Sequence, residues 1–248
     1  DELVRIGPQQ TAQAPAALVF SYEAAWTIGI QPQGQSFRYL ELVFEWYSAL
    51  RQRGLDVDIV SPDADLSAYP MVVVPTLPII PEGFVEKLAA LTCPVLLGPR
   101  SGSKTASFTI PQGLAPGDLK ELIDLTVTRV ESLRDGVSAP AEGWSVTRWR
   151  EDVRARFAPE LADAAGRGVI YAVANRRYCA IWPDAALLRL LIERMACEAG
   201  VDLLDLPEGI RVRRSASYAF TFNYAAQPVL VPHLGETRAP ASCHIAPI

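Results

Sequence analysis

The 248-residue sequence predicts an α/β protein in which a doubly wound, mainly parallel sheet is followed by a small all-β domain. Short apolar runs of strand length recur along most of the chain, and segments with helical spacing of apolar residues separate them. This alternation is typical of βαβ units, which place parallel strands in one sheet. Beyond Pro207 the pattern changes to short strands separated by turns, which predicts the β domain.

Four runs rich in apolar residues have the length of strands, and one of them, residues 71–75, is nearly continuous in apolar residues, as central parallel strands tend to be. They span residues 16–20, 55–60, 71–75 and 94–98. Helical spacing predicts one helix over residues 36–53, ended by Gly54, and another over residues 82–91. Strand, helix, strand, strand, helix, strand is the order of a Rossmann-like or flavodoxin-like sheet.

The rest of the chain predicts further strands and one long helix. Residues 126–157 are rich in strand-forming residues, as in an insertion or an extension of the sheet. Residues 169–174 and 178–182 form an expected hairpin, and residues 184–199 carry a strongly periodic helix that ends at Gly200.

The helix expected at residues 36–53 is apolar on more than one face. The face that we assign to the sheet carries Phe37, Leu40, Val43, Phe44, Tyr47 and Leu50. The remaining faces carry Leu42, Trp46 and Ala49, which is more than a helix covering one side of a sheet requires. We therefore expect a second contact surface on this helix.

Composition excludes several classes of function. A net charge of −5 and a pI near 5.2 argue against a nucleic-acid partner, and the arginines at positions 148, 150, 154 and 156 are interpreted as a solvated surface. No apolar run approaches the roughly 20 residues that cross a bilayer, and the start of the sequence shows no secretory signal, so we expect a cytoplasmic protein without a membrane partner. Four cysteines without a CxxC pair predict buried thiols rather than a metal site or disulfides.

Residues 98–105 (GPRSGSKT) resemble a phosphate-binding loop that follows a strand, but the match is incomplete. Ser103 stands where the motif requires Gly, and the residues that follow predict an extended segment rather than a helix. No GxGxxG follows the first strand. We therefore expect no cofactor.

The same segment also resembles the strand-to-turn elbow in which class I glutamine amidotransferase-like folds place a nucleophilic Cys between two glycines. Here Arg100 occupies the nucleophile position, and Trp182-Pro183-Asp184 stands where that fold has His-Pro-Glu. Cys93 precedes its strand, at the wrong end for this chemistry, and a hydrolase using Cys93 with His244 is the weakest alternative. No pair of carboxylates can be chosen for glycoside hydrolysis, so we assign no catalytic residue.

Several segments, in order, resemble the trimerisation domain of glycoside hydrolase family 42. They are residues 17–26 (ALVFSYEAAW), 31–34 (QPQG), 44–47 (FEWY), 55–60 (LDVDIV) and 98–105 (GPRSGSKT). The resemblance covers residues 16–206 and implies an amidotransferase-like scaffold that assembles three subunits of a β-galactosidase. It also implies that residues 1–15 are a linker from a catalytic barrel absent here, and that residues 208–248 are a small C-terminal β domain.

The resemblance implies a non-catalytic assembly role, a homotrimer, and the catalytic barrel of the same polypeptide as a partner. We expect residues 22–35 to form a loop that packs on the barrel or on a neighbouring subunit, with an ordinary connection as the alternative. The candidate interface or ligand-facing residues are Tyr22, Trp26, Gln31, Gln33, Trp46, Arg100 and Lys104. The alternative function is a free-standing α/β domain that binds a small polar or anionic ligand at the carboxyl ends of its strands, where Arg100 and Lys104 could hold an anion.

Overall fold

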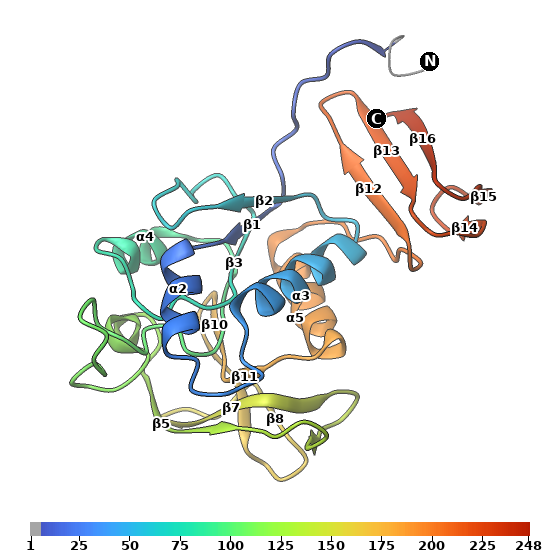
Figure 1. Cartoon of the computed structure of the whole chain (residues 1–248). Helices are drawn as coiled ribbons and strands as arrows, with labels where there is room; N and C mark the ends of the chain where they lie inside the picture. The colour runs from blue at the N-terminus through green and yellow to red at the C-terminus, as the bar shows by residue number, and fades with distance from the viewer. Residues whose placement is uncertain (1–5) are drawn as a thin grey trace.

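The computed structural model describes residues 6–248, and its centre is a mixed seven-stranded sheet (Figure 1). The strands lie in the order β2-β1-β3-β4-β10-β9-β8. Their bounds are β1 Ala16–Val19, β2 Val57–Val60, β3 Met71–Val74, β4 Val95–Leu97, β8 Leu161–Ala162, β9 Gly168–Val173 and β10 Arg176–Cys179. The first five in this order are parallel, and β9 and β8 are antiparallel additions at one edge. The predicted strands and the predicted hairpin are confirmed.

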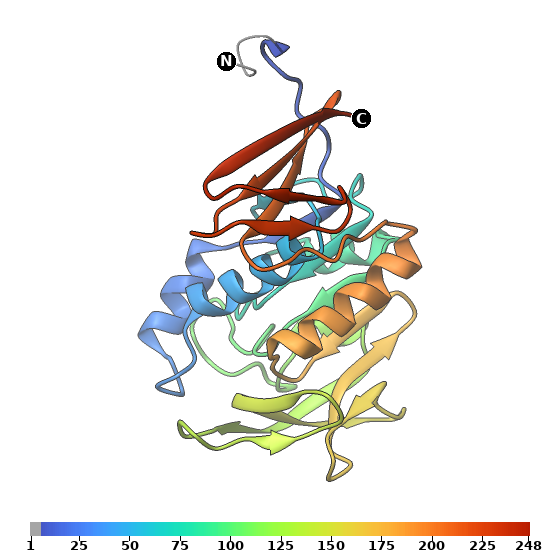
Figure 2. The ribbon, with the colours of Figure 1, turned by 90° about the vertical axis from the view of Figure 1, so that its right-hand side faces the viewer.

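Helices α2 Tyr22–Ile30, α3 Tyr39–Gln52, α4 Phe84–Ala90 and α5 Ala185–Ala199 accompany the sheet, with a short 3₁₀ turn at Gly117–Glu121. Helix α3 packs against both α5 and α2, and the three lie together in Figure 2. The buried faces of α3 and α5 continue the apolar core of the sheet, so the sheet and its helices share one core. Within the described part of the chain, no helix is long and apolar enough to cross a membrane.

Residues 22–30 form helix α2, which corrects the prediction of a loop over residues 22–35. Ser21 caps the helix, because its side-chain oxygen accepts a hydrogen bond from the Ala24 backbone N–H at 3.2 Å. Ala24, Thr27 and Ile28 are buried, and this spacing of three and four residues directs one face of the helix inward.

The predicted surplus of apolar residues on α3 is present, but the core takes residues from both predicted faces, and Val43 and Leu50 are buried as assigned. Leu42, Trp46 and Ala49 point into the core, and Trp46 is only 1% exposed. Leu40 and Phe44, which we assigned to the sheet, are instead among the most exposed large apolar residues. Both sets have helical spacing, so spacing alone does not distinguish the inner face from the outer one.

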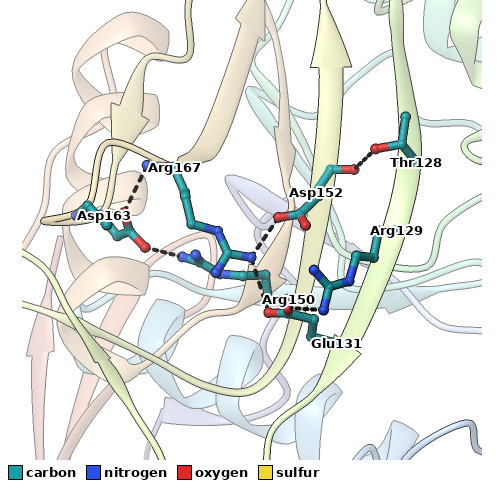
Figure 3. A network of polar contacts seen from close by, with 8 residues as sticks. Thr128, Arg129, Glu131, Arg150, Asp152, Asp163 and Arg167 are labelled. Carbon is teal, nitrogen blue, oxygen red and sulfur yellow. Dashed lines mark hydrogen bonds and ion pairs between the residues drawn. The ribbon is translucent and has the colours of Figure 1, made fainter.

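A separate antiparallel sheet follows the central one, as the β-rich segment predicts. It is built from β5 Leu125–Ser132, β6 Ala139–Pro140, β7 Ser145–Ala155 and β11 Ile181–Trp182. Figure 3 shows polar contacts that join this sheet to residues 163–167 beside the edge of the central sheet. Arg167 pairs with Asp152 on β7 at 2.7 Å and with Glu131 on β5 at 3.1 Å.

Arg150 corrects part of the prediction of a solvated arginine surface. Its guanidinium is buried and pairs with the equally buried Asp163 at 2.7 Å. Arg148 lies over the ring of Trp182 at 4.6 Å, whereas Arg154 and Arg156 are exposed as predicted. Because a buried guanidinium requires a partner, Arg150 has a structural role in joining β7 to the turn at Asp163.

The C-terminal residues form two small sheets beside the α/β body (Figure 2). One contains β12 Ile210–Arg214, β13 Tyr218–Asn223 and β16 Ser242–Pro247, and the other contains β14 Val229–Val231 and β15 Glu236–Arg238. They have a small apolar cluster of their own. The chain before β1 runs along this region, where Thr11 bridges to Ser215. Part of the predicted linker, residues 1–5, lies outside the described residues, and the domain boundaries remain predictions.

Candidate functional site

Residues 98–102 form a tight turn after β4, here termed the elbow, and Arg100 stands at its centre. Arg100 has a φ of 64°, a left-handed conformation that is uncommon for a residue with a side chain. A Cβ at Gly98 would lie 1.8 Å from the carbonyl oxygen of Pro75, and one at Gly102 would lie 1.8 Å from that of Pro116. The two glycines therefore allow close backbone packing and do not form a phosphate cradle.

The Arg100 side chain points into the protein and is only 1% exposed. It donates hydrogen bonds to the carbonyl oxygens of Pro32 at 2.7 Å and Gln31 at 2.8 Å. Its guanidinium lies over the rings of Phe37 at 4.7 Å and Trp149 at 5.2 Å, and burial lowers the pKa of Arg100 to about 10. This corrects the prediction that Arg100 is available to an anion at the strand ends.

Glu151 lies behind the elbow and is fully enclosed. It accepts hydrogen bonds from the Arg100 backbone N–H at 2.8 Å, from the Trp149 indole N–H at 3.1 Å and from the Tyr178 hydroxyl at 2.6 Å. Burial raises the pKa of the Glu151 carboxyl group, and the three donors act against that rise. Because it is buried and both of its oxygens accept hydrogen bonds from the protein, this carboxylate supports the turn.

The other residues with reactive side chains are not brought together. Cys93 is half-buried before β4 begins, at the end of that strand opposite Arg100, and His244 lies in β16 of the C-terminal sheet. Lys104 is nearly buried and lines a hollow of about 200 Å³ together with Asp118. Within residues 6–248, no group of three or more His, Cys, Asp or Glu side chains could hold a metal ion.

Exposed and half-buried apolar side chains gather on α2, α3 and the adjoining strand ends, in a cluster here termed the α2–α3 apolar patch. It consists of Phe20, Tyr22, Trp26, Leu40, Phe44, Tyr47 and Ile59. Tyr22, Leu40 and Phe44 are 68%, 64% and 66% exposed. All but Trp26 line a shallow groove of about 830 Å³, and Tyr22 contacts the Phe20 ring at 4.9 Å and the Trp26 ring at 6.3 Å. A contiguous apolar surface of this kind marks an interaction site.

The predicted site residues fall in different places. Tyr22 and Trp26 belong to the patch, whereas Trp46 lies in the core and is not available to a partner. Gln31 is the C-terminal cap of α2, and Gln33 is exposed in the turn that follows. Whether any of these residues contacts a partner remains a prediction.

Sequence reasoning did not select the patch residues that come from α3 and β2. Leu40, Phe44, Tyr47 and Ile59 are apolar residues within predicted elements, where burial is the ordinary expectation. The available signal was the presence of two apolar faces on one helix, since a helix against a sheet needs only one.

Residues 14–202 match the family described as the beta-galactosidase trimerisation domain. The chain is 47% identical over 236 residues to a beta-galactosidase of Thermus thermophilus, covering 94% of this chain and 37% of that protein. It is 33% identical over 239 residues to beta-galactosidase BgaH of Haloferax lucentense, covering 88% of this chain and 36% of that protein.

Solved structures show the same relationship. The beta-galactosidase of the psychrophilic Marinomonas ef1 superimposes with a TM-score of 0.89 at 30% identity, over 95% of this chain and 38% of that one. The beta-galactosidase of Halorubrum lacusprofundi does so with a TM-score of 0.88 at 27% identity, over 97% of this chain and 40% of that one. The chain thus spans well under half the length of the relatives that it matches.

Proposed function

Because the chain belongs to the beta-galactosidase trimerisation domain family, we propose that it is the assembly portion of a longer β-galactosidase and holds three subunits together. The observation that carries the proposal is the α2–α3 apolar patch. Its aromatic and aliphatic side chains resemble the centre of a protein–protein interface, which is enriched in Tyr, Trp and Phe, and Glu41 is the one charged residue that lines the groove. We assign this patch to the contact between subunits.

The architecture supports a scaffold role. The parallel strands in the order β2-β1-β3-β4-β10 are consistent with the doubly wound, amidotransferase-like fold predicted from sequence. In that fold the position after β4 would carry the nucleophile, and here Arg100 fills it and is bonded to backbone carbonyl groups. The family match over residues 14–202 supports a boundary near residue 206, with residues 208–248 as a separate β unit.

Hydrolysis of β-galactosides is assigned to the longer protein. Hydrolysis requires two carboxyl groups that face each other across a space for the sugar. The three buried carboxylates of the described residues, Asp56, Glu151 and Asp163, all accept hydrogen bonds from groups of the protein itself. The Arg100 side chain is enclosed and not available to an anion at the strand ends, so it does not support the alternative function.

Multi-angle light scattering of the chain over a range of concentrations, beside an assay on a chromogenic β-galactoside, tests the proposal. We expect a species of three times the 27.0 kDa chain mass that shows no turnover. A monomer at all concentrations would contradict self-assembly by this portion alone. Turnover that co-purifies with the chain would contradict the absence of catalytic groups.

A further inference from the structure

We propose that Arg100 is a positioning residue that holds helix α2 in place and thereby presents the α2–α3 apolar patch for assembly. The inference rests on the proposed function for the role of the patch, but the restraint on α2 is argued from contacts alone. In this proposal the Arg100 side chain takes no part in a reaction, and its role at the elbow is to fix the neighbouring helix α2.

Helix α2 has little stability of its own. It contains nine residues, fewer than the roughly 12–15 at which even favourable isolated helices become marginal in water. Only Ala24, Thr27 and Ile28 are buried, and Gly29 lies in its last turn. Tyr22 and Trp26 project outward, so the helix contributes two patch residues while it has little apolar anchoring.

The N-terminal end of α2 is held by two contacts. The Ser21 side chain accepts from the Ala24 N–H at 3.2 Å, and the Ser21 backbone N–H donates to the Tyr39 hydroxyl at 2.7 Å. Tyr39 is buried at the start of α3, and burial raises its pKa to about 12. The hydroxyl therefore stays protonated, and the start of α2 is fixed to the start of α3.

The C-terminal end of α2 depends on Arg100. The helix has no basic residue in its last turn, and its final backbone bond runs from the Gln31 N–H to the Thr27 carbonyl at 2.9 Å. Beyond it, the carbonyl groups of Gln31 and Pro32 point to the two arms of the Arg100 guanidinium. A cation at this end complements the helix dipole, and it satisfies the carbonyl group of the C-cap residue and that of the residue after it.

Arg100 is itself held rigidly. Its backbone N–H donates to the enclosed Glu151, its guanidinium lies over the rings of Phe37 and Trp149, and it stands in the turn that follows the parallel strand β4. Because the side chain is fixed at this many points, it holds the end of α2 at a defined position relative to the central sheet. Its left-handed backbone directs the side chain inward instead of into the space above the strands.

The test compares Arg100→Met with Arg177→Met in the complete 248-residue chain. Arg177 is also a buried, multiply bonded guanidinium, but its partners are Glu160 and Glu198, away from α2. Hydrogen exchange by mass spectrometry is followed for residues 22–30 and for β3, and light scattering gives the mass. Arg100→Lys, which keeps the charge but loses the two-armed geometry, serves as the conservative variant.

We expect Arg100→Met to raise exchange in residues 22–30 at least about tenfold, because two charge-assisted bonds are lost, while β3 keeps its protection. Arg177→Met should leave the protection of α2 relative to β3 unchanged. Arg100→Lys should give an intermediate rise in exchange, and it takes the place of Arg100→Met in the comparison with Arg177→Met if Arg100→Met does not fold. Assembly should weaken in the same order as α2 loosens.

Wild-type exchange in residues 22–30 of both Arg100 variants would overturn the inference, as would equal loosening of α2 by Arg177→Met. A loosened α2 with an unchanged oligomer mass would overturn the link to assembly. If the wild-type chain is a monomer, the proposed self-assembly fails. The exchange data then decide by themselves whether Arg100 positions α2.

Discussion

Replacing Phe44 with Glu should separate the assembled chain into monomers while leaving each monomer folded. Phe44 is 66% exposed on the outer face of α3, so its ring contributes little to the core of the isolated chain. If the α2–α3 apolar patch is the contact between subunits, that exposed surface becomes buried on assembly. The carboxylate would then be buried without a partner.

The magnitude follows from the exposed area. An aromatic side chain buries roughly 150–250 Å² in a complete contact, so two thirds of a Phe corresponds to about 130 Å². At about 25 cal/mol per Å² this surface contributes about 3 kcal/mol to each contact. Since each 1.4 kcal/mol is a tenfold change in affinity, the dissociation constant should rise at least about a hundredfold.

Sedimentation velocity and light scattering over a range of concentrations measure this change. Ile110→Glu is the matched control, because Ile110 is a 62% exposed apolar residue on a loop outside the patch. Circular dichroism should show unchanged helix and sheet content in both variants. The reasoning is refuted if Phe44→Glu assembles as the wild-type chain does, or if Ile110→Glu dissociates it equally.

Three further predictions concern stability and are measured by urea unfolding. Gly98→Ala should destabilise the chain by about 3 kcal/mol or more, since its methyl group would overlap the carbonyl oxygen of Pro75. Gly29→Ala, in the open last turn of α2, should stabilise the chain by up to about 1 kcal/mol, and equal effects of the two variants would contradict this account of the elbow. Burial raises the pKa of Glu151 in the folded state, so the free energy of unfolding should fall as pH rises above 4.5, the ordinary pKa of this carboxyl group, through the folded pKa. Glu151→Gln should lack this fall, and a profile identical to that of the wild type would exclude this titration. Arg177→Met should lower the free energy of unfolding by about 2 kcal/mol at neutral pH, a moderate loss because the partners Glu160 and Glu198 are partly exposed. Because Arg177 lowers the pKa of Glu198, this loss should become smaller as pH falls below about 4.5, and a loss independent of pH would contradict the pairing.

Much of the α/β unit was predictable from local pattern. The four parallel strands and helices α3, α4 and α5 were placed because strands buried on both faces are continuously apolar and long helices show their spacing. That Arg100 cannot act as a nucleophile could also be deduced from residue type, because a guanidinium does not attack a carbonyl group.

Helix α2 shows where local pattern is insufficient. Residues 22–30 (YEAAWTIGI) combine aliphatic, aromatic and polar residues with one glycine, and Ser21, Tyr39 and Arg100 make contacts at the two ends of the helix. Two of these three contacts come from residues distant in sequence. The spacing of apolar residues does not indicate contacts between residues that are distant in sequence, so the segment was predicted as a loop.

The sequence by itself determined the order of strands and helices, the absence of a nucleophile at the elbow and an excess of apolar surface on α3, because each is a property of residue type and spacing. Only the tertiary structure decided which face of α3 turns inward, since two apolar faces compete and packing against the sheet and α5 selects one. It also decided that Arg100 is enclosed, because burial of a charge depends on whether distant carbonyl groups and rings surround it. The contact that places α2 and the patch that α2 helps to form are thus both products of long-range packing.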